Sequence, residues 1–136
     1  MDFLKALVAF LASNGVLSPE VSSAGDGITF LQHLPDDPVE ANCVTCYDSK
    51  LPTLVNKQSG VYHIQILMRR KKHNDVLTEI TKVFQFLCSL SELVEDISED
   101  YYAIFDVSTG PVPLGTDDNG SWRYSLNFPV TSKMYK

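Results

Sequence analysis

Two cysteines three residues apart, Cys43 and Cys46, form the pattern in this sequence that most suggests chemistry. A Cys-x-x-Cys pair acts as a redox centre at a helix N-terminus, where the helix dipole lowers the pKa of a thiol. Here the pair lies within Asn42–Tyr47, a β-patterned stretch, so residues three apart point to opposite faces of a strand. That geometry also disfavours metal chelation, and the third cysteine and three histidines lack zinc-site spacing. We predict core thiols, with a redox or metal role as the alternative.

Two pairs of adjacent carboxylates, Asp36-Asp37 and Asp117-Asp118, invite a general acid–base hypothesis. Both pairs lie in turn contexts, where Asp is favoured because its side chain hydrogen-bonds the local backbone. The stretch Asp117–Gly120 resembles part of a calcium loop, but the acidic residue required at the twelfth position is missing. Motifs of serine hydrolases, P-loop enzymes, zinc proteases and kinases are absent. The sequence therefore predicts no catalytic residue, no cofactor and no metal.

One strongly basic run, made of Arg69, Arg70, Lys71 and Lys72, suggests a patch that touches DNA or an acidic partner. The alternative, favoured by frequency, is a solvated corner between a strand and a helix. The net charge of -6 argues against tight, sequence-independent DNA binding, which depends on neutralising phosphates. The basic corner is therefore a candidate for local contacts only.

The first half of the chain predicts one helix and three strands. Apolar residues at helical spacing mark a helix over Phe3–Ala12, which Gly15 ends. Strands are predicted over Ile28–Leu31, Asn42–Tyr47 and Val61–Met68, with a long connection between the last two. In the third strand the apolar residues Tyr62, Ile64, Ile66 and Met68 alternate with the others and should face the core.

The second half predicts a long helix and a hairpin. Asn74 is the expected N-cap of a helix with a broad apolar stripe from Val76 to Cys88. A strand over Tyr101–Val107 follows. Two further β-patterned runs, Pro111–Leu114 and Ser121–Val130, flank Asn119-Gly120, a strong hairpin signal because both residues tolerate positive φ.

The whole pattern predicts one domain over residues 1–136 of the α+β class. We expect a largely antiparallel or mixed β-sheet with two main helices packed on one face. The apolar run at the N-terminus is too short to span a bilayer and lacks the features of a secretion signal. With an odd number of cysteines, a reduced cytosolic protein with no membrane contact is expected.

Several segments, taken in order, resemble the minor capsid or tail-terminator family of phages that infect Gram-positive bacteria. The segments are His33–Pro38, Asn42–Asp48, Gln65–Arg69, Ser108–Gly120 and Tyr124–Phe128. The first resembles the family's Met-Pro-Asp-x-Pro turn, the third its Gln-x-x-x-Arg strand, and the last two its C-terminal hairpin. The resemblance covers residues 28–131, with one departure at Ser49–Pro52, where the family has a glycine-rich turn.

The resemblance implies a structural, non-enzymatic subunit that forms a ring, expected to be a hexamer, on the last ring of the tail tube. There it halts tube polymerisation and presents a surface to the head. The implied partners are copies of itself, the tail-tube protein and a head-completion or connector protein. The implied location is the virion neck, after assembly in the host cytoplasm. Another neck or tail role, in head completion or in the tube itself, is the alternative.

Long loops on a rigid sheet are where recognition concentrates, so we expect the Asp48–Gly60 loop and the Pro111–Gly120 region to contact other subunits. The candidate residues are Lys50, Leu51, Pro52, Asn56, Lys57, Asp117 and Asn119. The basic corner is the candidate for a passing contact with genomic DNA. The apolar helix Phe3–Ala12 is expected either at a subunit boundary or in the chain's own core.

Overall fold

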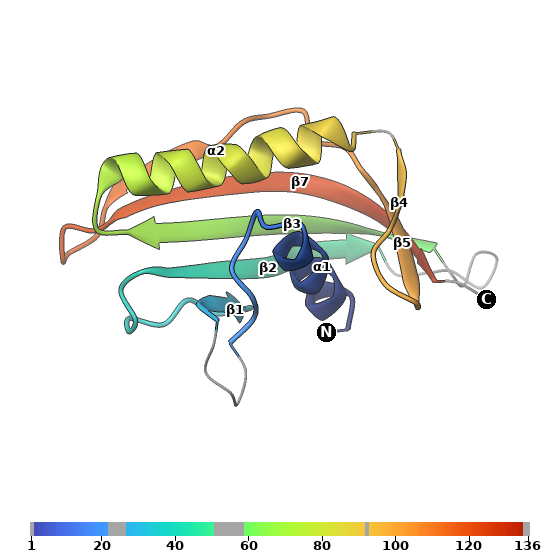
Figure 1. Ribbon diagram of the computed structural model, residues 1–136, viewed down its shortest axis with the longest axis horizontal. Helices are drawn as coiled ribbons and strands as arrows, with labels where there is room; N and C mark the ends of the chain where they lie inside the picture. Colours follow the sequence, from blue (N-terminus) through green and yellow to red (C-terminus); the bar gives the residue numbers. More distant parts are fainter. Residues whose placement is uncertain (1, 22–26, 51–58, 92, 135–136) are drawn as a thin grey trace.

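The computed structural model describes residues 2–21, 27–50, 59–91 and 93–134 (Figure 1). Its elements are α1 (Asp2–Ser13), β1 (Thr29–Leu31), β2 (Ala41–Lys50), β3 (Ser59–Arg70), α2 (His73–Ser89), β4 (Val94–Asp96), β5 (Tyr101–Phe105), β6 (Val112–Thr116) and β7 (Trp122–Met134). The strands form one sheet in the order β1-β2-β3-β7-β5-β4, and β6 also pairs with β7. The pairing of β1 with β2 is parallel and the other pairings are antiparallel. The predicted α+β class with a largely antiparallel, mixed sheet is confirmed.

Both helices cover the same face of this sheet. In Figure 1, α2 runs along β7 while α1 crosses in front of β3 and β2. The two helices also meet each other, since the ring centroids of Phe10 and Phe86 lie 6.0 Å apart. The predicted packing of two main helices on one face is therefore confirmed.

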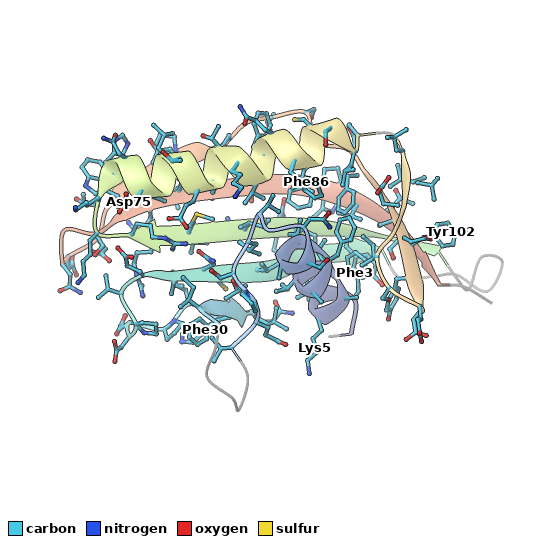
Figure 2. All side chains as sticks on the ribbon, viewed as in Figure 1. Phe3, Lys5, Phe30, Asp75, Phe86 and Tyr102 are labelled. Carbon is cyan, nitrogen blue, oxygen red and sulfur yellow. The ribbon has the colours of Figure 1, made fainter. Side chains whose placement is uncertain are left out.

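The apolar side of α1 is buried in the chain's own core, which decides between the two expectations for this helix. The buried side chains are Phe3, Leu4, Leu7, Val8 and Leu11. Figure 2 shows Lys5 pointing away from the sheet, on the opposite side of the helix. The helix ends as predicted at Gly15, whose φ of +73° lets the amides of Gly15 and Val16 bond back to the carbonyls of Ala12 and Leu11.

The alternating pattern of β3 predicted its core face correctly. Ile64, Ile66 and Met68 are buried under the helices, and the same face of β7 carries the buried Leu126 and Phe128. Each such side chain contributes about 1.5–3 kcal/mol through burial of apolar surface. These contacts join the two long central strands to the helix layer.

The start of α2 differs from the prediction. The N-cap is Lys72, which makes no side-chain cap bond, and Asn74 lies inside the helix. Tertiary contacts hold the first turn instead: the ring of His73 lies 4.6 Å from that of Trp122, and its Nε2 lies 2.7 Å from the hydroxyl of Tyr124. Packing against β7 therefore replaces a local cap.

One strand and one connection also differ from the prediction. Strand β4 was not predicted, because Val94–Asp96 shows no alternation and is ordered only by pairing with β5. Strand β2 continues to Lys50 and β3 begins at Ser59, so the connection between them is shorter than the predicted Asp48–Gly60. Of the candidate loop residues in this connection, Leu51, Pro52, Asn56 and Lys57 lie outside the described residues.

Candidate interaction surfaces

The predicted basic corner is split between the two faces of the sheet. Arg69 and Arg70 are consecutive in β3, so their side chains leave the strand in opposite directions. Only 6% of Arg69 and 2% of Arg70 is exposed, whereas Lys71 and Lys72 are exposed. The prediction of a four-residue basic surface is therefore wrong for the two arginines, and the lysines alone form the solvated corner.

Arg69 holds the connection between β1 and β2 against the sheet. Its Nε donates to the carbonyl of Val39 at 2.7 Å, and its Nη2 donates to those of Pro38 at 2.9 Å and Pro35 at 2.5 Å. The guanidinium therefore donates hydrogen bonds to three backbone carbonyls of one turn. Its role in the described structure is to fix that turn.

Arg70 joins β3 to α2 on the opposite face. Its Nε lies 2.8 Å from one carboxylate oxygen of Glu79, and its Nη2 lies 3.1 Å from the other. Its Nη1 donates to the carbonyls of Ala41 and of Arg69. All three guanidinium nitrogens of Arg70 therefore form bonds within the fold.

A cavity of about 320 Å³ lies beside this ion pair, between α2 and the segment that follows α1. It is lined by Gly15, Val16, Leu17, Ser18, Pro19, Asn42, Met68, Arg70, Glu79 and Lys82. The amide nitrogen of Asn42 donates to the hydroxyl of Thr29 at 3.1 Å, and that hydroxyl donates to the carbonyl of Ser18. These bonds fix the wall of the cavity, and no nucleophile lies beside a general base among its lining residues.

The two cysteines of the Cys-x-x-Cys pair lie on opposite faces of β2, as predicted. Cys43 pairs with Leu67 on the face away from the helices, and Cys46 pairs with the buried Ile64. Burial raises the pKa of the Cys43 thiol, and the contact with the Thr45 hydroxyl at 3.4 Å offsets only part of this rise. Cys43 is therefore a protonated, poorly nucleophilic thiol at neutral pH.

Replacing Cys43 and Cys46 together with serine is expected to preserve the fold, at a cost of about 1–2 kcal/mol for the buried hydroxyls. Circular dichroism and urea unfolding of the variant would measure both effects. An unfolding midpoint that shifts with added reductant in the wild-type protein, and not in the variant, would restore the redox alternative.

Asp117 organises the turn between β6 and β7. One carboxylate oxygen accepts hydrogen bonds from the amides of Asn119 at 3.0 Å and Ser121 at 2.9 Å. Gly120 has a φ of +79°, but Asn119 does not have positive φ, so the prediction of two positive-φ turn residues is wrong. The bond from the Gly120 amide to the Asp117 carbonyl instead fits a type I turn followed by a glycine bulge.

These amides lower the pKa of Asp117, first through the bond from Ser121 and further through that from Asn119. A carboxyl whose pKa is lower in the folded protein stabilises the fold above its unfolded pKa, and that contribution is lost as the pH falls through the folded value. We therefore expect the amide resonances of Asn119 and Ser121 to shift below about pH 4. Asp117→Asn should abolish this titration, whereas Asp118→Asn should preserve it. Identical titrations in both variants would contradict the assignment.

The face of the sheet turned away from the helices was not anticipated as a surface. Residues paired across strands share a face, so the registers define its rows. From one end to the other the rows are Cys43, Leu67, Ser125 and Val112; Thr45, Gln65 and Asn127; Asp48, His63 and Pro129; Lys50, Val61, Thr131, Ile104 and Val94; and Tyr102 and Asp96. We call these residues the outer face. The registers place the charged residues Asp48, Lys50 and Asp96 on this face, and Cys43 and Ser125 are each only 3% exposed.

The outer face was missed because the pattern within one strand cannot show which residues of other strands lie beside it. Alternation in β3 did place Val61, His63, Gln65 and Leu67 on one side. Only the register shows that residues of β2, β4, β5, β6 and β7 continue the same face. Arg69 and Arg123 pair at its end, where Arg69 holds the β1–β2 connection.

Comparison with known proteins gives one result for the family. Neither helix in the described ranges has the length and apolarity that a membrane span requires. No curated protein matches the chain. A family model described as bacteriophage tail terminator protein matches residues 10–133. This match spans nearly all of the sequence and confirms the resemblance to a phage tail-terminator family, while the Gram-positive host stays a prediction. The chain therefore belongs to the bacteriophage tail terminator family, a family of structural proteins of the phage tail.

Proposed function

We propose that residues 1–136 act as one tail-terminator domain that forms a ring, a hexamer, on the end of the tail tube. The family match over residues 10–133 carries this proposal. The ring halts polymerisation of the tube and joins the tail to the head. Its partners are copies of itself, the tail-tube protein and a head-completion or connector protein, and its location is the virion neck. The chain catalyses no reaction.

The proposed action is geometric. A contact between two different surfaces of identical subunits closes into a ring when its rotation divides a full turn. Tube growth stops if one side of that ring matches the tube and the other lacks the surface that a tube subunit offers for the next ring. The negative net charge suits a channel through which DNA moves without sticking, with Lys71 and Lys72 limited to a passing contact.

The candidate contacts with the tube are Lys50 at the end of β2, the connection that contains Leu51, Pro52, Asn56 and Lys57, and the turn that contains Asp117 and Asn119. Replacing residues 51–58 with a two-residue turn is expected to preserve the fold, because loops tolerate changes of length better than strands do. The same variant should no longer cap tubes. Circular dichroism and electron microscopy of tails would check the two halves of this expectation, and normal capping would dismiss the role of the connection.

Phage assembly without this protein is the direct test of the proposed function. Overlong or headless tails would support termination and joining. Tails of normal length on particles that fail only to retain DNA would favour a head-completion role instead. Supplying the wild-type chain in trans should restore normal tails, which controls for effects on neighbouring genes.

A further inference from the structure

One buried acceptor in the wall of the cavity between α2 and the segment after α1 has no partner. Asn42 is fully buried, and its Oδ1 accepts no hydrogen bond from any of the residues that the structure describes. Burying a polar atom without a partner destabilises a fold, so proteins retain few such atoms. An apolar side chain of similar shape would avoid this cost. The packing of β2 alone therefore does not account for the acceptor.

The hydrogen bonds around Asn42 determine which end of its amide is left over. The hydroxyl of Thr29 has one proton, which it donates to the carbonyl of Ser18 at 2.7 Å. This hydroxyl must therefore accept from Asn42, and Nδ2, at 3.1 Å, is the end of the amide that can donate. A flipped amide would place two acceptors against each other. Because Asn42 lines the cavity, Oδ1 is the acceptor that the amide offers to an occupant.

The cavity is large enough for a ligand. Its volume of about 320 Å³ is far above the ~10–15 Å³ that one ordered water requires and matches the lower end, about 300 Å³, of ligand pockets in proteins. Val16, Leu17 and Met68 supply apolar parts of its wall. A single water could satisfy Oδ1 but would leave these apolar groups facing more water. A compact apolar ligand with one donor satisfies the acceptor and covers the wall.

The charges around the cavity favour a neutral ligand. Both carboxylate oxygens of Glu79 accept bonds from Arg70, so the charges of this pair offset each other. Lys82 is exposed and adds a positive charge, which disfavours a cationic ligand. An anionic group at the inner end would meet Oδ1, which cannot donate a hydrogen bond to it. A neutral N–H or O–H group is therefore the best partner for Asn42.

We propose that this cavity binds a compact, neutral and largely apolar group that donates one hydrogen bond to Oδ1 of Asn42. Indole and phenol rings have this chemistry. They occur in free small molecules and in the tryptophan and tyrosine side chains of neighbouring proteins. None of the residues that line the cavity belongs to the candidate contacts with the tube, so the site is distinct from those surfaces.

Two probes of matched shape test the donor. Indole and benzofuran share a fused two-ring frame, but only indole carries an N–H donor. Each probe would be titrated into the purified chain while the amide resonances of Gly15, Leu17 and Ser18, in the cavity wall, are followed by NMR. Indole is expected to bind at least about tenfold more tightly, as one hydrogen bond allows. Equal affinities, or no shift of these resonances in millimolar indole, would overturn the inference.

Asn42→Leu removes the acceptor and keeps a side chain of similar shape. We expect the preference for indole over benzofuran to vanish in this variant, and its unfolding midpoint in urea to be no lower than that of the wild type, because the unpaired acceptor is lost as well. Lys82→Met, at an exposed position of the cavity wall, is the control and should keep the preference. A preference that persists in Asn42→Leu would overturn the inference. If Asn42→Leu does not fold, the comparison of the two probes on the wild type decides alone.

Assembly of tails in saturating indole distinguishes the two sources of the donor, and this arm of the experiment rests on the proposed function. Fewer capped tails in indole than in benzofuran at the same concentration would identify a side chain of a neighbouring protein as the natural occupant. Equal capping in both would identify a free small molecule. The titrations use the purified chain alone, so failure of the proposed function would leave their outcome unchanged.

Discussion

Replacing Arg69 with methionine is expected to lower the free energy of unfolding by about 3 kcal/mol and to release the turn at Pro35–Val39 from the sheet. The side chain is almost fully buried and donates to three carbonyls of that turn. A hydrogen bond to a charged group contributes about 1.5–3 kcal/mol, but the three effects do not add, because the freed carbonyls regain water when the turn lifts away. The expected loss is therefore close to that of one or two such bonds.

Lysine at the same position should recover only part of this loss. Its compact ammonium keeps the charge but lacks the planar, forked donors that reach several carbonyls at once. Urea unfolding would give the stability of each variant, and hydrogen exchange would show whether opening is confined to the β1–β2 connection. Lys71→Met is the control, because this exposed neighbour should change stability by no more than about 0.5 kcal/mol. Equal stability of the Arg69 and Lys71 variants would contradict the assigned role.

This contact also explains two of the motifs behind the family resemblance. The segment His33–Pro38 provides the carbonyls of Pro35 and Pro38, and Arg69 ends the segment Gln65–Arg69. The two motifs lie about thirty residues apart in the sequence and form one contact in the structure. Likewise, Asp117 and Gly120 of the C-terminal motif build the turn of the hairpin. In this chain these residues therefore hold the β1–β2 connection and the hairpin turn in place.

Local patterns predicted those features that depend on local physics. Alternation gave the core face of β3, helical spacing gave α1, and Asn119-Gly120 gave the hairpin. The prediction failed at Arg69 and Arg70, where charge was taken as a sign of the surface although the strand period of two continues through both residues. Their partners lie in a distant turn and on α2, so no window around position 70 could reveal them.

The candidate surfaces also divide into those set by local residue types and those set by pairing between distant strands. The turn at Asp117 was found because its residue types are local signals. The outer face depends on the register of long strands, including the pairs Gln65–Asn127 and Thr131–Ile104, which connect segments far apart in the chain. Strand β4 likewise depends on β5 for its order. Pairing between strands that are distant in the sequence determines these features. Patterns within a single segment of the sequence do not show that pairing.

Removing Glu79 is the second change with a large expected effect. Glu79→Ala leaves the guanidinium of Arg70 buried without its counter-ion, although its bonds to the carbonyls of Ala41 and Arg69 remain. Breaking a fully buried ion pair from one side costs about 3–5 kcal/mol. Here the Glu79 side chain is 46% exposed, so solvent screens the pair and the expected cost is about 2 kcal/mol. Alanine is a good helix former, so this cost does not arise from α2 itself.

The double variant separates the cost of an unpaired charge from the value of the contact. Arg70→Met removes the buried charge, so adding Glu79→Ala should then cost almost nothing, and the double variant should be no less stable than Glu79→Ala alone. Urea unfolding of both single variants and the double variant, with Gln85→Ala as the control on the same helix, gives the coupling energy directly. A double variant whose loss equals the sum of the two single losses would show that Arg70 and Glu79 act independently. In that case α2 would be held on β3 by apolar packing alone, through residues such as Ile80 and Val83, which are fully buried.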